Sequence, residues 1–269
     1  MLIETSKVSV IVPTKNSGRS LQRCLLSIRK QTYPHIEIIV VDGHSRDQTR
    51  NIATKHADTV IEYTGERSEA RNLGARSSQG GYLLFIDSDM YLSANVVSEC
   101  VKAAEASKEV AVIIPESAVG EGFWARCREL EKECYLGDDE LEAARFFPRE
   151  LFLALGGYDA SLGPAGEDWD LTIRVRQKGC RVVRVDSLAI HDDGPLTLGA
   201  AMKKKRYYGR YLRRFLERHQ HEARRRLSPV RLAYLRNLKK LARAPGRAAG
   251  LFVLKLGELL ATGLGMMER

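Results

Sequence analysis

Two carboxylates separated by a single serine, Asp87 and Asp89, follow an apolar run that extends from Tyr82 to Ile86. A short continuous apolar run is typical of a buried strand in a parallel sheet, so we expect the strand to bring both acids to the sheet's carboxyl edge. Open α/β sheets bind their ligands at that edge. Neighbouring carboxylates repel each other unless a cation lies between them, and a divalent ion bound to them keeps positions free for substrate phosphates. The alternative interpretation is a polar turn that caps a following helix at Ser93.

Acidic residues also lie at the ends of two other predicted elements. Asp42 ends the second apolar run, and Glu167 and Asp168 stand where a loop passes into a predicted helix. There the helix dipole lowers the pKa of a carboxyl group and a neighbouring acid raises it, so the dominant effect at Asp168 stays open. Glu167 and Asp168 are either catalytic acids or residues that simply favour a helix N-terminus. Trp169 and Asp170 are interpreted as structural.

The order of the elements predicts an α/β fold. Helical patterns alternate with apolar runs that predict strands, at residues 7–13, 36–42, 59–63, 82–86 and 110–115. This alternation is typical of βαβ units, so residues 1–115 are predicted to form a Rossmann-like doubly wound, mostly parallel sheet. Ser45 to Gln48 fit a capping box that opens the second helix. Beyond residue 115 the pattern becomes irregular, with further strands and helices before His191.

Five segments, taken in order, resemble the family 2 glycosyltransferases. They are PTKN at 13–16, VDGHSRDQT at 41–49, ARNLGA at 70–75, LLFIDSDM at 83–90, and GGYD at 156–159 with GEDWDLTIRVRQKG at 166–179. The resemblance covers residues 7 to about 192 and depends on the joint order and separation of the segments. It implies the GT-A fold, a nucleotide-diphosphate sugar donor, Mn²⁺ or Mg²⁺ as cofactor, and inversion of the anomeric centre.

The resemblance also implies roles for individual residues at the donor. It places six residues at the donor nucleotide-sugar, namely Pro13, Thr14, Asn16, Asp42, Arg71 and Asp87. Asp42 falls where a carboxylate meets the base, and Asp87 falls near the ribose. Arg71 has an alternative interpretation, because it could pair with Glu66 or Glu69 on a helix surface.

Metal and catalytic residues follow from the same comparison of motifs. Asp89 is implied as a metal ligand, and His191 lies where many relatives place a histidine near the diphosphate or metal. Asp168 is implied as the general base, with Glu167 beside it. An inverting transfer needs a base on the acceptor side and a positive charge on the donor side, and the sequence supplies a candidate for each. His191 could equally fill or cap a turn.

Two departures from the family pattern leave the donor's identity open. Many relatives have a second acid after the Asp42 position, where this chain has Gly43 and then His44. The first loop has Thr14 and Lys15 where an aromatic and other residues are common. The sequence therefore does not choose between a UDP- and a GDP-linked sugar.

The C-terminal segment differs in composition from the rest of the chain. Residues 202–247 contain 17 Lys or Arg against two Glu, a net charge of +15, and since the whole chain carries +9, the remainder carries −6. Aromatic and leucine residues interleave with the cations and predict basic amphipathic helices. The final apolar segment, Leu251 to Met267, holds Lys255, Glu258 and Thr262 on one narrow stripe, and at 17 residues it is a poor membrane-spanning helix.

The basic segment is interpreted as a surface that binds anionic lipid headgroups. Nucleic acid is a competing partner, but no helix-turn-helix, zinc or RNA-recognition motif accompanies the cations. A solvated basic helix packed on the enzyme is the other alternative. The five cysteines are scattered and odd in number, so they are predicted to be reduced and mostly buried, and no signal peptide is expected at the N-terminus.

These observations define the predicted organisation and function. Residues 1–196 form a GT-A domain, with a nucleotide-sugar half at 1–115 and an acceptor half at 116–196, and residues 197–269 form a basic helical extension. The predicted function is a metal-dependent inverting glycosyltransferase that acts on a glycan or polyprenyl-linked acceptor, in the cytoplasm on the inner face of the cell membrane. The alternatives are a non-catalytic GT-A domain that binds a nucleotide or a partner, and a sugar-nucleotide nucleotidyltransferase, for which the glycine-rich opening loop is missing.

Overall fold

The computed structural model describes residues 6–105, 107, 109–138, 141–220, 222 and 232–268, and packing within the chain divides it into two compact units. The sheet unit consists of Met1–Pro115, Ala143–Ala160 and Asp168–Ile190. The helical unit consists of Glu116–Glu142, Ser161–Glu167 and His191–Arg269. The division into functional halves at residues 115 and 196 stays a prediction, and packing assigns two segments beyond residue 115 to the sheet unit.

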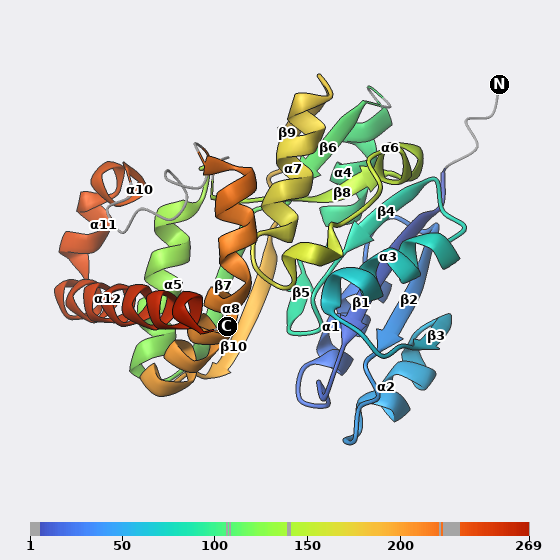
Figure 1. Ribbon diagram of the computed structural model, residues 1–269. Coiled ribbons are helices and arrows are strands. Elements are labelled where there is room, and N and C mark those ends of the chain that lie inside the picture. The colour runs from blue at the N-terminus through green and yellow to red at the C-terminus, as the bar shows by residue number, and fades with distance from the viewer. Residues whose placement is uncertain are drawn as a thin grey trace. The chain divides into compact units, whose positions relative to one another are not determined.

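The sheet unit is built on seven strands in the order β3-β2-β1-β4-β8-β6-β9 (Figure 1). Their bounds are β1 (Val8–Thr14), β2 (Ile36–Asp42), β3 (Thr59–Glu62), β4 (Tyr82–Phe85), β6 (Val110–Ile113), β8 (Ala144–Pro148) and β9 (Arg181–Arg184). β1 is parallel to β2 and β4, β2 is parallel to β3, and β6 is parallel to β9. β8 is antiparallel to both of its neighbours, β4 and β6. The predicted mostly parallel α/β sheet is confirmed.

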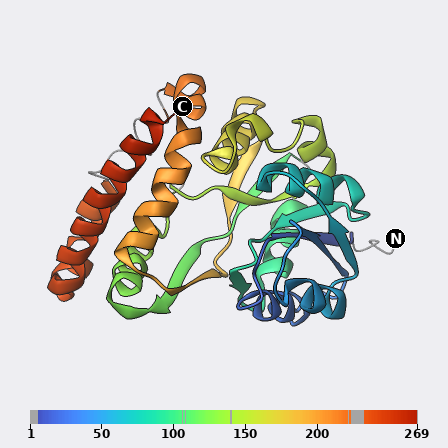
Figure 2. The same ribbon diagram turned by 60° about the horizontal axis from the view of Figure 1, so that its bottom comes forward.

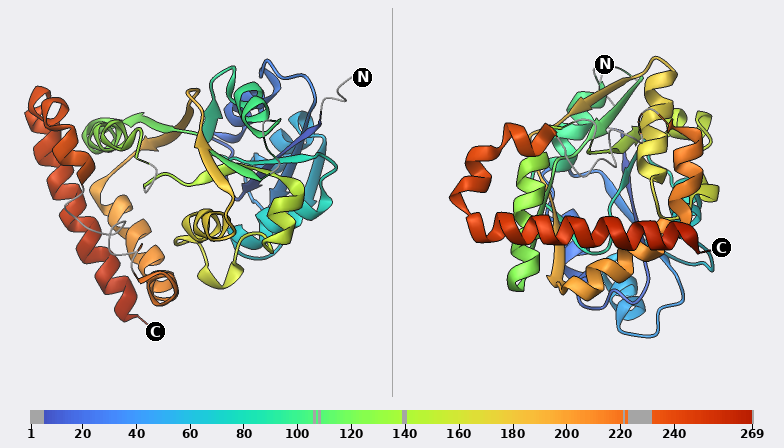
Figure 3. Two further views of the ribbon diagram at one scale, coloured as in Figure 1. Left: turned by 90° about the horizontal axis from the view of Figure 1, so that it is seen from above. Right: turned by 60° about the vertical axis from the view of Figure 1, so that its left-hand side comes forward.

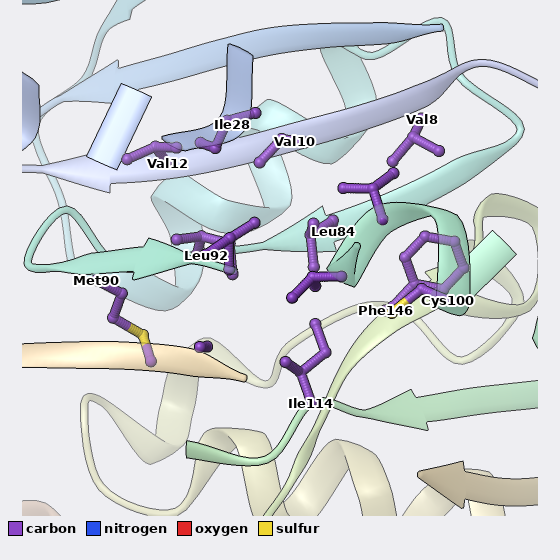
Figure 4. Packing of buried hydrophobic residues seen from close by; sticks show 14 of the residues in the cluster. Val8, Val10, Val12, Ile28, Leu84, Met90, Leu92, Cys100, Ile114 and Phe146 are labelled. Carbon is purple, nitrogen blue, oxygen red and sulfur yellow. The ribbon is translucent and has the colours of Figure 1, made fainter. Parts of the chain in front are cut away.

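Helices cover both faces of the sheet. Val8, Val10 and Val12 of β1 pack in one hydrophobic cluster with α1 (Leu21–Arg29), α2 (Thr49–His56) and α4 (Val96–Glu105) (Figure 4). Ile11, on the opposite face of β1, packs in a second cluster with α3 (Arg67–Ser77), α6 (Arg149–Ala154) and α7 (Glu167–Gln177). Because strand side chains alternate between faces, a single apolar strand supports both layers. The sheet unit is therefore doubly wound, as predicted.

Some local predictions were wrong. The capping box predicted at Ser45 does not form: α2 starts at Thr49 after Gln48, and Ser45 Oγ donates instead to Asp42 Oδ1 at 2.5 Å. Two short strands were missed, β5 (Met90–Leu92) and β7 (Glu116–Glu121). At three to six residues, both are too short for a clear alternation of apolar and polar residues.

The helical unit contains β7, most of β10 and several helices. Their bounds are β10 (Ala189–Pro195), α5 (Gly122–Tyr135), α8 (Leu198–Arg218), α10 (Leu232–Arg236), α11 (Leu238–Arg243) and α12 (Pro245–Met267), and a short 3₁₀ turn, η1 (Ala160–Leu162), lies at the boundary of the two units. Figures 2 and 3 show α12 running beside α8, which agrees with their close packing at Gly209 and Gly265. Thr197 caps α8 by accepting a hydrogen bond from the backbone N–H of Ala200 at 3.2 Å.

α12 is longer than the sequence indicated. Pro245 stands in its first turn, where the missing N–H costs nothing, so the helix has 23 residues rather than the expected 17. Within the described part of the chain, α12 is the one helix long and apolar enough to cross a membrane by length and composition. All five cysteines are free and buried, as predicted.

Candidate functional site

The loops after β1 and β2 are joined by a hydrogen-bond network. Thr14 and Asp42 are register partners at the ends of the two strands. Asp42, 1% exposed, accepts hydrogen bonds from Ser45 Oγ at 2.5 Å and from Ser45 N at 3.0 Å. Asn16 N donates to Ser45 Oγ at 2.8 Å, and Arg46 N donates to Asn16 Oδ1 at 2.9 Å. Asp42 and Asn16 therefore shape the two loops at the carboxyl edge, a role that the sequence did not reveal.

Gly43, where the sequence departs from the family pattern, lies in a crowded part of the backbone. Gly43 N donates to Thr14 O at 2.8 Å, and a Cβ at this position would lie 3.3 Å from the same oxygen and from Lys15 Cδ. The next residue, His44, has a backbone φ of 54°, a value that residues other than glycine rarely adopt. The second acid of many relatives would therefore crowd the first loop.

Thr14 carries a buried hydroxyl at this edge. Its Oγ1 is shielded from solvent and has no hydrogen-bond partner among the residues that the structure describes. A buried hydroxyl without a partner costs about 1–3 kcal/mol, so such groups often mark places where a ligand completes the structure. The buried Oγ1 of Thr14 lies at the end of β1. Its lack of a partner there is consistent with a ligand that binds at the first loop.

Asp87 and Asp89 lie in a turn directly after β4. Asp87 O accepts a hydrogen bond from Met90 N at 2.9 Å, which closes the turn. Ser88 Oγ lies 2.8 Å from Ser17 Oγ, so the turn is tied to the loop that follows β1. The apolar strand therefore brings both carboxylates to the carboxyl edge, next to the Thr14 and Asp42 strand ends.

Asp87 is surrounded by arginines. Arg71 Nη2 lies 2.5 Å from Asp87 Oδ1, and Arg145 Nη1 lies 3.5 Å from Oδ2. Burial alone would raise the pKa of Asp87, but the guanidinium groups of Arg71, Arg67 and Arg145 hold that pKa well below its usual range. Arg71 is 2% exposed, so it is not the solvent-facing helix residue of the alternative interpretation. Neither Arg67 nor Arg145 was predicted at this site. Arg145 reaches the edge through the pairing of β4 with β8.

This arrangement separates the two acids of the DSD turn. Asp87 is charged and bound by arginines, which makes Asp89 the better candidate for a metal ligand. No group of three or more His, Cys, Asp or Glu side chains within the described ranges is arranged to hold a metal. A site with one or two carboxylates suits a hard divalent ion that obtains its other ligands from phosphate oxygens. Asp89 therefore fits a metal that binds together with a nucleotide diphosphate.

His191 belongs to the helical unit. Its Nδ1 lies 3.4 Å from Asp193 Oδ1 in β10. Asp89, the other predicted metal ligand, is assigned to the sheet unit. A role for His191 at the metal stays a prediction.

Glu167 and Asp168 open α7, as predicted. Glu167 is 1% exposed, whereas Asp168 is half-buried and accepts a hydrogen bond from Trp169 N at 2.8 Å. Thr172 Oγ1 donates to Asp168 O at 2.9 Å and accepts a hydrogen bond from Ala144 N of β8 at 3.0 Å, which fixes the helix start to the sheet. Of the two acids, Asp168 is the one that is partly exposed to solvent.

The GGYD turn connects the last turn of α7 to α3. Asn72 Nδ2 donates to Tyr158 O at 2.7 Å, and Tyr158 N donates to Asn72 Oδ1 at 2.9 Å. Arg174 of α7 donates to Gly157 O at 2.7 Å, and the Arg71 guanidinium lies 5.2 Å from the centre of the Tyr158 ring. The turn thus holds Arg71, and through it Asp87, in position.

Asp170 supports the same turn. It is fully buried and accepts a hydrogen bond from Arg174 Nε at 2.8 Å, while Arg174 Nη1 donates to Leu155 O at 2.6 Å. This contact agrees with the structural role expected for Asp170.

Comparison with known proteins gives the family. The sequence model described as Glycosyl transferase family 2 matches residues 9–155. Glycosyltransferase GlyG of Streptococcus pneumoniae is 33% identical over 114 residues, which cover 40% of this chain and 38% of GlyG. The chain thus spans well under half the length of that relative. The match of the family model to more than half of the chain shows that it belongs to glycosyl transferase family 2, as the motifs indicated.

Solved structures confirm the GT-A fold. Mannosyltransferase PcManGT from Pyrobaculum calidifontis, in complex with GDP-Man and Mn²⁺, superposes with a TM-score of 0.66 at 19% identity and covers 99% of this chain and 88% of that one. TarS 1-349 of S. aureus, in complex with UDP-GlcNAc, has a TM-score of 0.53 at 18% identity and covers 79% of this chain and 72% of that one. At such identities the likeness establishes the fold alone.

Proposed function

We propose that this chain is a metal-dependent inverting glycosyltransferase that uses a nucleotide-diphosphate sugar. The observation that carries the proposal is the cluster at the carboxyl edge of the sheet unit, where Asp87 is bound by Arg71 and Arg145 next to Asp89. Family membership and the GT-A fold support it. A cluster of cations beside a carboxylate suited to a divalent ion matches the charge of a diphosphate.

The proposed reaction assigns a step to each group. The half-buried Asp168 carboxylate takes the proton of the acceptor hydroxyl, and the acceptor oxygen forms a bond to the anomeric carbon on the face opposite the leaving group. The bond from that carbon to the β-phosphate oxygen breaks, and the nucleoside diphosphate leaves with the electron pair. Arg71 holds Asp87 toward the ribose, and Asn16 and Asp42 shape the loops that border the nucleotide. A divalent ion bound at Asp89, when present, offsets the charge that develops on the diphosphate.

The solved structures of similar proteins suggest which donor nucleotides and which metal ion to test. PcManGT was solved with GDP-Man and Mn²⁺ and TarS with UDP-GlcNAc, so both UDP and GDP are donor candidates and Mn²⁺ is the first ion to test. For the acceptor, the net +15 of residues 202–247 supports a glycan or polyprenyl-linked acceptor at an anionic membrane surface. The proposed location is the cytoplasmic face of the cell membrane.

Thermal unfolding of the purified protein tests the donor site. At a concentration of 100 times Kd, a ligand adds about 2.7 kcal/mol, which for this chain length raises the midpoint by roughly 5–10 °C. We expect a rise with UDP or with GDP that needs Mn²⁺ and is lost in Asp89→Asn. Asp138→Asn, an acid of the helical unit, is the matched control and should keep the rise.

Turnover then separates an enzyme from a binding module. We expect Asp168→Asn to bind the nucleotide as the wild type does but to lose at least about 100-fold in kcat, because a general base contributes roughly 10²–10⁴. Unchanged turnover in Asp168→Asn would remove this residue from the mechanism. Nucleotide binding without turnover of any UDP- or GDP-sugar by the wild type would favour the non-catalytic alternative.

A further inference from the structure

The C-terminal helix α12 has the reverse of the usual surface pattern. Seven of its large apolar side chains are exposed, from 46% for Leu259 to 81% for Met267, whereas Leu251 and Leu254 are buried; the seven are Phe252, Val253, Leu256, Leu259, Leu260, Leu264 and Met267. The buried face of α12 includes small and charged residues, among them Gly250, Gly257, Glu258, Ala261 and Gly265. A helix on the surface of a water-soluble domain buries its apolar stripe and exposes its polar one.

Buried ion pairs hold α12 in this orientation. Lys255 Nζ lies 2.7 Å from Glu131 Oε1 and 2.8 Å from Glu258 Oε2. Arg128 of α5 pairs with Glu131 at 2.6 Å and also with Glu258. Turning the helix to expose its polar stripe would leave Arg128 and Glu131 buried without these partners, so the apolar face stays outside.

Small residues set the contact with α8. Gly257, Ala261 and Gly265 recur at every fourth position on the face of α12 that meets α8. A Cβ added to Gly265 would collide with the carbonyl oxygen of Arg206, so no larger residue allows this approach. Small residues at such spacing let the two helix backbones approach closely and leave the large apolar side chains on the opposite face.

A groove beside this contact combines apolar and basic groups. It has a volume of about 370 Å³, and Met202, Leu260 and Leu264 contribute to its apolar wall. Lys203 and Arg206 line the same groove, and Arg206 also pairs with Glu268 at the end of α12. An acyl chain with a phosphate at its end presents the complementary chemistry.

Exposed apolar residues are concentrated in the helical unit. Of the 14 large hydrophobic side chains that are exposed in the described part of the chain, 13 belong to this unit and ten lie on α10, α11 and α12. Exposed cations accompany them on α8 and α11, among them Lys203, Lys204, Arg210, Arg213, Arg214 and Lys239. Four further basic residues of the predicted segment, Arg224, Arg225, Arg226 and Arg231, lie outside the described residues.

We propose that the exposed face of α12, with its groove against α8, binds an anionic lipid bilayer with the helix lying in the plane of the membrane. The large side chains of α12 enter the acyl region, and Lys203 and Arg206 contact lipid phosphates. The proposal deepens the membrane part of the proposed function and identifies the surface that carries it. It depends only on the helical unit, so it can fail while the donor site stands.

Two other arrangements fit the charges less well. If α12 crossed the bilayer, its partner α8 would bring Lys204 and the ion pairs of Arg210 with Glu268 and Arg213 with Glu217 into the hydrocarbon. Charged side chains at that depth are costly. If a second copy of the chain covered the face, a two-fold interface would place Lys203 and Arg206 near their own copies. An anionic lipid surface satisfies both the apolar face and the cations.

Vesicle flotation of the full-length protein tests the proposal. We expect the wild type to float with phosphatidylcholine vesicles that contain about 30% phosphatidylglycerol, and to bind phosphatidylcholine alone at least about tenfold more weakly. Leu256→Glu with Leu260→Glu should weaken binding roughly tenfold or more, since both side chains lose their burial in lipid. Lys203→Gln with Arg206→Gln should reduce the preference for the anionic vesicles.

Two matched variants serve as controls. Leu153→Glu changes a leucine of the sheet unit that is 39% exposed and should float as the wild type does. Asp168→Asn should float normally too, which separates lipid binding from the proposed catalysis. If the Leu256 and Leu260 variant does not fold, Phe252→Ser with Met267→Ser replaces it, because those side chains are 71% and 81% exposed.

Three outcomes would overturn the proposal. Flotation of the Leu256 and Leu260 variant at the wild-type level would exclude α12 as the lipid contact. Conversion of a dimer to a monomer by that variant, measured by light scattering with flotation unchanged, would assign the face to a second copy. Equal binding to neutral and anionic vesicles by the wild type would remove the role of Lys203 and Arg206.

Discussion

The guanidinium of Arg71 lies 2.5 Å from the carboxylate of Asp87, and only 2% of Arg71 is exposed. This contact joins α3 to the turn after β4 inside the sheet unit. The Arg71 guanidinium lies over the ring of Tyr158. Asn72, the next residue after Arg71, donates a hydrogen bond to the backbone oxygen of Tyr158. Two motifs that are 16 residues apart in the sequence therefore form one charged unit at the candidate donor site.

Removing either partner of this pair should be costly, and the two changes should not add. We expect Asp87→Ala to destabilise the fold by about 3–5 kcal/mol, since it leaves the buried Arg71 charge without its main partner, and Arg71→Ala to cost less, because Asp87 is 19% exposed and keeps Arg145. The double variant should show a coupling of about 1–3 kcal/mol in urea unfolding. Arg76→Ala, an exposed arginine of the same helix, is the control and should stay within about 0.5 kcal/mol of the wild type. Additive effects would mean that the pair is not an energetic unit.

The hydroxyl of Thr14 allows a test in which stability and binding change in opposite directions. Thr14→Val keeps the shape and removes a buried hydroxyl that has no partner within the described ranges, so we expect the free protein to gain roughly 1 kcal/mol. If a bound nucleotide completes this group, the rise in midpoint caused by UDP or GDP should shrink in the variant. Thr54→Val, at an exposed position of α2, is the control for the exchange itself. A rise of the same size in Thr14→Val and in the wild type would place the hydroxyl outside the ligand site.

The sequence predicted the sheet unit because its signals are local. Continuous apolar runs such as Tyr82 to Ile86 mark buried strands, and the acids that follow them lie at the carboxyl edge where they were expected. The environment of Asp87 could not be predicted, because Arg145 reaches it through the antiparallel pairing of β8, which no spacing in the sequence encodes. The direction in which α12 faces was also beyond the sequence, since it depends on Arg128 and Glu131 in α5.

The GGYD turn contains two glycines that a single substitution can compare. Gly156 and Gly157 have φ values of 78° and 71°, so alanine at either position adopts a left-handed backbone at a cost of about 1–2 kcal/mol. A Cβ at Gly156 would meet no atom within 4 Å, whereas at Gly157 it would lie 2.5 Å from Asn72 Oδ1. We therefore expect Gly157→Ala to lower stability clearly more than Gly156→Ala in urea unfolding. We also expect it to weaken nucleotide binding, because Asn72 positions Tyr158 under Arg71. Equal losses of stability in the two variants would show that the Asn72 side chain can move away from the added Cβ without a cost in stability.

Acid should weaken the helical unit through Glu131. Burial alone would raise the pKa of this carboxyl, but Lys255 and Arg128 hold it well below its usual value of 4.5. Because the folded-state pKa lies below the unfolded one, the group contributes stability above about pH 4.5 and loses that contribution as the pH falls toward the folded-state pKa. We expect Glu131→Gln to lower the thermal midpoint at pH 7, since two cations lose their partner, and to reduce the further fall between pH 5 and about pH 3. Glu133→Gln, an exposed neighbour on α5, should keep the acid response of the wild type. If Glu131→Gln and the wild type lose stability in parallel over that range, the ion pairs that orient α12 do not contribute to its stability, and the outward apolar face must be held by the small-residue contact with α8.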